Sequence, residues 1–157
     1  MEKIKKIRRD VIINGKEVSL KGPATDRFLD VLRAHGFKSI KEGCGEGICG
    51  ACSIILNGHL INSCLMLFGQ VKDGDKIINA EHEDELISKI RTSFLDAGAV
   101  QCGFCTPGMI MAAYALLSKN KSPTEDEIKL AMSGNLCRCT GYVKIVEGIK
   151  EAVTNKS

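Results

Sequence analysis

Hydrophobic and polar positions in the first half of the chain alternate over short runs that are separated by tight turns. Residues 4–13 alternate imperfectly and are rich in β-branched side chains, and Asn14-Gly15 separates them from a second run at 17–20. Asn-Gly between two such runs predicts a β-hairpin, because both central residues must take positive φ. Three further strands are predicted, two of them flanking a second Asn-Gly turn, at residues 53–56, 59–62 and 76–79.

Helical spacing of apolar residues predicts one helix in the first half and four in the second. The first helix carries apolar residues at 28, 29, 31 and 32, could be capped by Thr25 or Asp26, and should end at Gly36. After residue 80 the helical pattern takes over. The four predicted helices are residues 86–97, ending at Gly98, residues 106–119, opened by Thr106-Pro107, residues 124–133, opened by a Thr124/Glu127 capping box, and residues 140–153, capped by Thr140.

These elements predict an α+β protein with two small domains. Residues 1–80 would form a domain of strands and one helix, and residues 81–157 a compact helical bundle joined through a short charged linker at 81–84. The longest apolar run, residues 109–117, is too short to cross a bilayer.

Charge narrows the range of partners. The chain has 22 basic and 19 acidic residues and a net charge of +3, too small to favour nucleic acid or a membrane surface as partner. The first ten residues are charged and lack the apolar stretch of a secretory signal, so a cytoplasmic location is expected. Thiols stay reduced there, and clustered cysteines then indicate a metal or catalysis more often than disulfides.

Eight cysteines fall into two sets of four, with none left over. The first set has the spacing C-x4-C-x2-C-x11-C and comprises Cys44, Cys49, Cys52 and Cys64. The second has the spacing C-x2-C-x31-C-x-C and comprises Cys102, Cys105, Cys137 and Cys139. Four thiolates are the ligand number of one iron–sulfur cluster, and C-x4-C-x2-C is the plant-type 2Fe–2S spacing. The chain is therefore predicted to carry single electrons.

The surroundings of both sets suit such clusters. Four glycines interleave with Cys44, Cys49 and Cys52, allowing the backbone to wrap closely and to expose N–H groups to sulfur. The predicted hairpin at 53–62 explains the long gap, because it returns the chain to the same loop at Cys64. The second set lies next to predicted helix N-termini, which favour anionic groups.

Several alternatives compete with this interpretation. Structural zinc bound by four cysteines is the main competing metal, and four disulfides would require a secretory context that is missing. Cys102-Gly103-Phe104-Cys105 has the spacing of a thioredoxin-type redox pair, but no βαβ unit surrounds it. The segment 45–50 matches G-x-G-x-x-G, but it follows a helix and precedes a strand, the reverse of a dinucleotide site.

Three segments together resemble the iron–sulfur subunit of the xanthine oxidase family of molybdenum hydroxylases. They are residues 42–52 (EGCGEGICGAC), 101–109 (QCGFCTPGM) and 133–142 (SGNLCRCTGY). They occur in the family's order, the resemblance extends over nearly the whole chain, and all eight cysteine positions match. It implies a plant-ferredoxin-like β-grasp domain followed by a four-helix bundle, each with a 2Fe–2S cluster.

The resemblance also implies an electron route and partners. Electrons would leave a molybdopterin centre, expected in its cytosine dinucleotide form, on a molybdenum-binding large subunit. They would pass the cluster of the helical domain and then that of the β-grasp domain, and reach FAD on a medium subunit. By the same resemblance, Gln101 and Cys139 would contact the pterin. A free-standing two-cluster ferredoxin is the rival function, and the substrate cannot be inferred from this chain.

Overall fold

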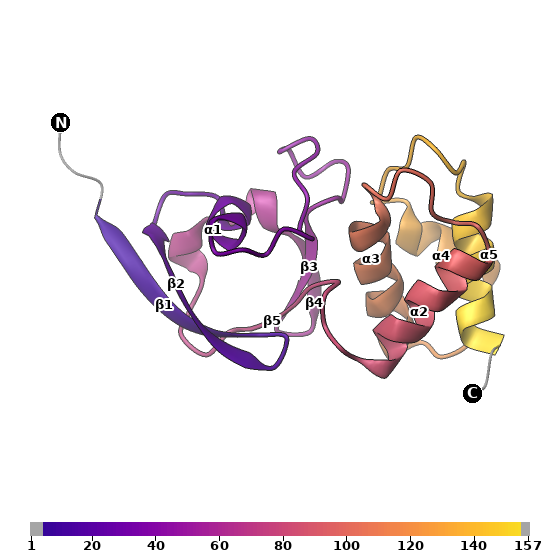
Figure 1. The fold of residues 1–157 in the computed structure, drawn as a ribbon, viewed down its shortest axis with the longest axis horizontal. Helices are drawn as coiled ribbons and strands as arrows, with labels where there is room; N and C mark the ends of the chain where they lie inside the picture. The colour runs from indigo at the N-terminus through magenta and orange to yellow at the C-terminus, as the bar shows by residue number, and fades with distance from the viewer. Residues whose placement is uncertain (1–4, 155–157) are drawn as a thin grey trace.

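The computed structural model describes residues 5–154, in which a sheet-containing half and a helical half lie side by side (Figure 1). Five strands form one mixed sheet in the order β2-β1-β5-β3-β4. Strands β1 and β5 pair in parallel, whereas the other neighbours are antiparallel. The strands are β1 (Lys6–Ile13), β2 (Lys16–Pro23), β3 (Ser53–Leu56), β4 (His59–Asn62) and β5 (Lys76–Ile78).

Helix α1 (Phe28–Ala34) and two short 3-10 helices, η1 (Ser63–Leu65) and η2 (Phe68–Gln70), complete this half. Phe28 and Phe68 are fully buried and their rings stack with centroids 6.4 Å apart, which ties α1 to η2. Both predicted Asn-Gly turns are confirmed, with φ of 51° at Asn14 and 49° at Asn57.

The predicted cap of the first helix is wrong. Helix α1 begins at Phe28, so Thr25 and Asp26 lie too early in the chain to cap it, and Arg27 precedes the helix without a side-chain cap. The Arg27 guanidinium instead pairs with Asp30 and Glu42.

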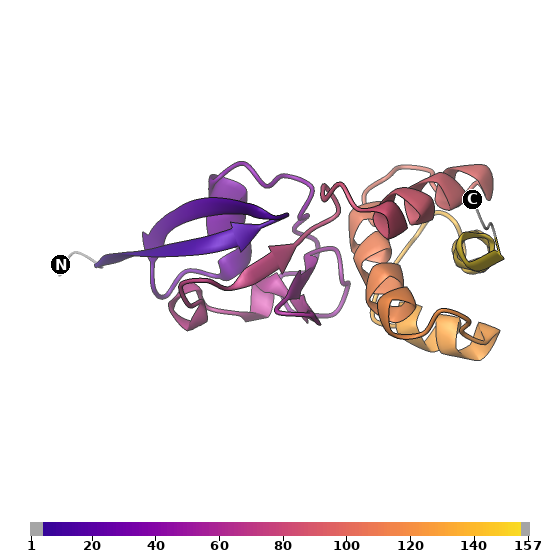
Figure 2. The same cartoon turned by 90° about the horizontal axis from the view of Figure 1, so that it is seen from below.

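Four helices form the second half, and Figure 2 shows them from below, grouped on the far side of the β3–β4 hairpin from β1 and β2. They are α2 (Glu85–Asp96), α3 (Thr106–Lys119), α4 (Glu125–Met132) and α5 (Val143–Thr154). The predicted α+β fold, ferredoxin-like domain first and helical domain second, is confirmed.

The caps of these helices follow the prediction in part. The Thr124/Glu127 capping box of α4 is present, and Asp84, which the sequence analysis did not identify, caps α2 by accepting from two backbone N–H groups. Thr140 does not cap α5, because the helix starts three residues later and the threonine hydroxyl lies 3.2 Å from Cys137 Sγ.

Helix α3 is buried on most of its surface because it lies between the sheet and the other helices. Met109, Met111, Ala112 and Ala113 are each at most 1% exposed. Ile55 of β3 joins the hydrophobic core of the helical half. The two halves therefore share apolar contacts through the helix that follows the second cysteine pair. None of the helices described between residues 5 and 154 is both long and apolar enough to cross a membrane.

Candidate metal centres

The first cysteine set occupies one loop and the end of one hairpin. Cys44, Cys49 and Cys52 lie between α1 and β3, and Cys64 lies in η1, directly after β4. The β3–β4 hairpin thus returns the chain to the loop, as predicted from the gap of eleven residues. Cys44 is exposed and Cys49 partly so, whereas Cys52 and Cys64 are buried.

Backbone N–H groups in this loop point at sulfur. Glu46, Ile48 and Cys49 donate to Cys44 Sγ over 3.3, 3.3 and 3.4 Å, and Cys44 donates to Cys49 Sγ over 3.3 Å. These bonds, led by that from Glu46, lower the pKa of Cys44 to about 6. The loop therefore stabilises a thiolate at Cys44, the form that binds metal.

Cys64, in contrast, has its pKa raised by its surroundings. Burial, followed by contact with the Cys52 thiol, raises the pKa of Cys64 to about 11. Cys44 acts on the same thiol from the cysteine loop and also raises its pKa.

The second set brings together two segments that are far apart in the sequence. Cys102 and Cys105 lie at the start of α3, and Cys137 and Cys139 lie in the loop between α4 and α5. The Cys139 and Cys102 sulfurs are 3.6 Å apart. Burial and then contact with Cys137 raise the pKa of Cys105 to about 12.

Cys137 is the sulfur of this set that favours the anionic form. Burial alone would raise its pKa, but hydrogen bonds from the Thr140 hydroxyl and from the backbone N–H of Thr140 outweigh burial. With further backbone and cysteine donors they lower its pKa to about 7.

The ligand number of each set suits a binuclear core. A 2Fe–2S cluster takes four cysteine ligands, two on each iron. Within residues 5–154, no three Cys, His, Asp or Glu side chains converge as ligands of a single metal ion would. The four cysteines of each set match the ligand number of such a cluster.

Removing the Thr140 hydroxyl should lower the reduction potential of the second cluster. Hydrogen bonds to ligand sulfur favour the more negative, reduced state and so raise the potential. We expect Thr140→Val to retain the backbone bond to Cys137 and lose the hydroxyl bond, shifting one midpoint potential downward in an EPR-monitored redox titration. The first cluster serves as internal control, and unchanged potentials for both would contradict the assignment.

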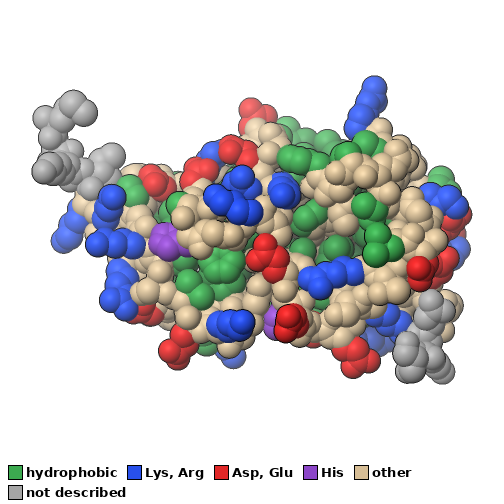
Figure 3. All heavy atoms as spheres, viewed as in Figure 1, with side chains coloured by type: hydrophobic (Ala, Val, Ile, Leu, Met, Phe, Trp, Pro, Cys, Tyr) green, Lys and Arg blue, Asp and Glu red, His purple; other side chains and the backbone are tan. Residues whose placement is uncertain are grey.

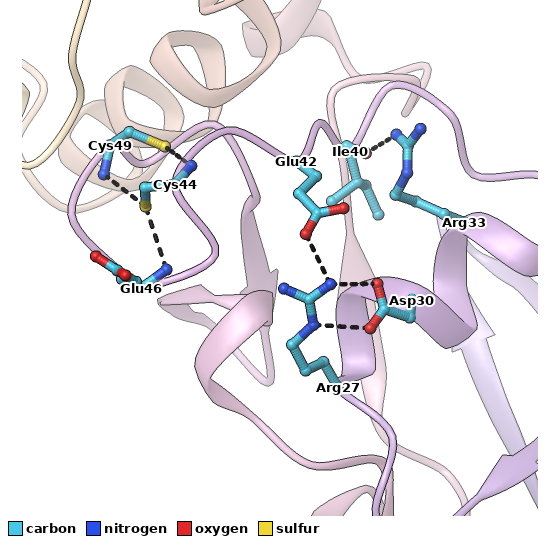
Figure 4. Close-up of polar contacts among 8 residues, drawn as sticks. All are labelled: Arg27, Asp30, Arg33, Ile40, Glu42, Cys44, Glu46 and Cys49. Carbon is cyan, nitrogen blue, oxygen red and sulfur yellow. Dashed lines mark hydrogen bonds and ion pairs between the residues drawn. The ribbon is translucent and has the colours of Figure 1, made fainter.

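An ion-pair network connects the start of the first cysteine loop to helix α1 (Figure 4). Arg27 bonds both carboxylate oxygens of Asp30, at 2.7 and 2.9 Å, and reaches Glu42 at 2.7 Å, two residues before Cys44. Arg33 donates to the Ile40 carbonyl over 2.6 Å. Contact with Asp30 and then Glu42 raises the pKa of Arg27, so the network stays charged. Helix α1 therefore positions the base of the cysteine loop, a role that the sequence analysis missed.

Tyr142 belongs to the segment 133–142 that carries the resemblance, but the sequence analysis assigned it no role. It adopts positive φ (71°), and its hydroxyl accepts a hydrogen bond from the Cys137 N–H over 3.0 Å. Such a backbone conformation is costly for a non-glycine residue. The sequence indicates such a role only through the position of Tyr142, three residues after Cys139.

Gln101 directly precedes Cys102 of the second set. It is exposed, and its side-chain amide donates to the Cys139 carbonyl over 3.3 Å. The two residues expected to contact pterin are thus joined, and both face solvent in this chain.

Large apolar side chains are exposed around both cysteine sets. Ile48 and Leu65 are 60% and 63% exposed beside the first set, and Phe104 and Leu136 are 47% and 51% exposed beside the second. On the face drawn in Figure 3, hydrophobic side chains gather in patches on both halves between scattered charged ones. Exposed apolar groups next to cofactor loops are typical of surfaces that partners cover.

Comparison with known proteins agrees with this architecture. Residues 11–87 match the family described as 2Fe-2S iron-sulfur cluster binding domain, and residues 77–150 match the 2Fe-2S binding domain family. The chain is 52% identical over 151 residues to the nicotinate dehydrogenase small FeS subunit of Eubacterium barkeri, covering 94% of this chain and 96% of that protein. It is 39% identical to the xanthine dehydrogenase iron-sulfur-binding subunit of Escherichia coli O157:H7, covering 92% of each.

A solved structure shows the same fold. The quinoline 2-oxidoreductase from Pseudomonas putida 86 contains a chain that superposes with a TM-score of 0.88 at 39% identity, covering 94% of this chain and 93% of that one. The chain belongs to the iron–sulfur subunits of the molybdenum hydroxylases of the xanthine oxidase family. It is an electron-transfer subunit of an oxidoreductase and carries 2Fe–2S domains.

Proposed function

We propose that each cysteine quartet holds one 2Fe–2S cluster and that the chain relays electrons between two partner subunits. Cys44, Cys49, Cys52 and Cys64 hold the first cluster, and Cys102, Cys105, Cys137 and Cys139 hold the second. Each cluster supplies one-electron chemistry when bound. The observation that carries the assignment is the meeting of separate chain segments at each quartet. The β3–β4 hairpin returns Cys64 to the loop of the other three cysteines, and the Cys102 and Cys139 sulfurs lie 3.6 Å apart.

The partners are a molybdenum-binding large subunit and an FAD-binding medium subunit. The helical half, with the exposed Gln101 and Cys139, faces the molybdopterin, in its cytosine dinucleotide form, and the first cysteine loop faces the FAD subunit. The apolar side chains exposed at both loops support an obligate subunit over a free ferredoxin. The complex works in the cytoplasm, and the chain divides near residue 80 into its two cluster domains.

Co-purification tests this proposal. A tagged copy of this chain, recovered gently from its own cells, should bring untagged subunits that contain molybdopterin and FAD. Iron and acid-labile sulfide should correspond to two 2Fe–2S clusters for each copy. A stable monomer with both clusters and no partner would establish the free ferredoxin instead.

Replacement of Gln101 should weaken the contact with the pterin-bearing subunit. We expect Gln101→Ala to leave both clusters assembled, because the side chain contacts a carbonyl and no sulfur. Turnover of the complex, or retention of the large subunit in size-exclusion chromatography, should fall. Gln70→Ala, which removes a glutamine whose side-chain oxygen accepts from the Leu67 N–H, is the matched control. Equal behaviour of the two variants would refute the role of Gln101.

For the substrate of the complex we propose an aromatic ring of the pyridine type. The support is the 52% identity with a nicotinate dehydrogenase subunit and the fold match with a quinoline 2-oxidoreductase, since both named substrates contain such a ring. The purified complex should reduce an artificial acceptor with pyridine carboxylates or quinolines in preference to purines and aldehydes. A preference for purines or aldehydes would overturn this proposal without affecting the cluster assignment.

A further inference from the structure

Asn135 is a buried polar residue that binds no metal and connects the two cysteine loops. It lies two residues before Cys137, in the helical half, and is only 4% exposed. Its side-chain amide donates to the Gly50 carbonyl over 3.0 Å, and Gly50 directly follows Cys49 in the other half of the molecule. A buried amide of this kind forms a strong constraint, because losing its partner leaves desolvated polar groups unpaired.

The surroundings of the bond leave it little freedom. The Gly50 carbonyl also accepts from the Ser53 hydroxyl over 2.7 Å and from the Ser53 N–H over 3.1 Å. The next residue after Asn135, Leu136, donates its backbone N–H to the Cys49 carbonyl over 2.9 Å. Two consecutive residues of one loop therefore bond two consecutive carbonyls of the other.

Helix α3 closes the same junction from a third side. A Cβ atom on Gly108, in the first turn of α3, would lie 2.3 Å from the Gly50 oxygen and 3.0 Å from Asn135 Nδ2. The backbones at Gly108 and Gly50 therefore approach too closely for a residue with a Cβ at position 108, which lies three residues after Cys105. Three segments meet at Asn135. They are the loop of the first quartet, helix α3, which begins directly after Cys105, and the loop that carries Cys137 and Cys139.

We infer that Asn135 is a positioning residue that sets the distance and orientation between the two clusters. The coupling between two redox centres depends steeply on both, so a fixed junction keeps transfer between them uniform from molecule to molecule. This inference rests on the proposed assignment of the eight cysteines. Wild-type protein without two clusters would refute that assignment, whereas the tests below apply to protein that has them.

The test measures the magnetic interaction of the clusters in the assembled complex. Each reduced 2Fe–2S cluster carries one unpaired electron, so two neighbouring clusters split each other's EPR lines by an amount set by their separation and orientation. Asn135→Asp keeps the size of the side chain but places a carboxylate oxygen against the Gly50 carbonyl. We expect the splitting of fully reduced protein to shrink or disappear, while each cluster keeps its own g values when the other is oxidised.

Asn62→Asp is the matched control. Asn62 also donates its side-chain amide to a glycine carbonyl of the first loop, Gly47, over 3.0 Å, but from within the same half. This variant should leave the splitting unchanged. If Asn135→Asp prevents assembly of the clusters, Asn135→Ser, which relieves the repulsion and shortens the side chain, is measured in the same way. Wild-type splitting in a variant that contains both clusters would overturn the inference.

Discussion

Cys49→Ser is expected to eliminate one of the two 2Fe–2S EPR signals and to leave the other. The serine oxygen is a poor replacement for a thiolate on iron. Cys49 lies in the same loop as Cys44, whose Sγ accepts hydrogen bonds from three backbone N–H groups. Without its partner sulfur, the first loop cannot complete four ligands. The second quartet is supplied entirely by other segments and should still assemble.

Cys137→Ser supplies the reciprocal measurement. It removes the sulfur whose pKa the Thr140 hydroxyl and N–H lower to about 7 against the effect of burial, and it should delete the other EPR signal. Iron and sulfide content should fall by half in each variant. Loss of the same signal in both variants, or retention of both signals in either, would contradict the division of the cysteines into two quartets.

Much of the fold could be predicted because its signals are local. The two Asn-Gly turns and the Thr124 capping box each depend on residues within four positions of each other, and all three are present. The predicted cap of α1 was wrong because Thr25 and Asp26 satisfy a local rule, whereas the helix begins later, after Arg27, and the Arg27 side chain pairs with Glu42, fifteen residues further along. Local pattern cannot indicate such a partner.

The candidate centres divide in the same way. Cysteine count and spacing predicted the two quartets, because ligand chemistry restricts which residue types can bind iron. The pairing of Cys102 with Cys139, and the connection of Asn135 to Gly50, join residues 37 and 85 positions apart. Only the packing of α3 between the two halves brings them together.

Gly50→Ala is expected to destabilise the protein strongly, because strain and steric overlap act at the same position. Gly50 has φ of 68°, a left-handed conformation that costs about 1–2 kcal/mol for a residue with a Cβ. The added Cβ would also lie 2.4 Å from Asn135 Nδ2 and 2.5 Å from the Gly134 carbonyl oxygen. Overpacking of this kind costs about 1–3 kcal/mol. The two effects together predict a loss of about 2–5 kcal/mol.

Two glycine controls separate these contributions. Gly58 has φ of 83°, and an added Cβ would have no atom within 4 Å. Gly58→Ala should therefore lose only the free energy of the left-handed conformation. Gly108 lies in a helix without positive φ, so Gly108→Ala should show the steric cost, reduced by the roughly 0.5–1 kcal/mol that alanine gains over glycine in a helix. Apparent unfolding temperatures, followed by visible absorption of the clusters, should fall by roughly 2–4 °C for each kcal/mol. If the unfolding temperature of Gly50→Ala falls no further than that of Gly58→Ala, the junction around Asn135 can accommodate an added methyl group. The junction would then not hold the two cysteine loops in a fixed arrangement.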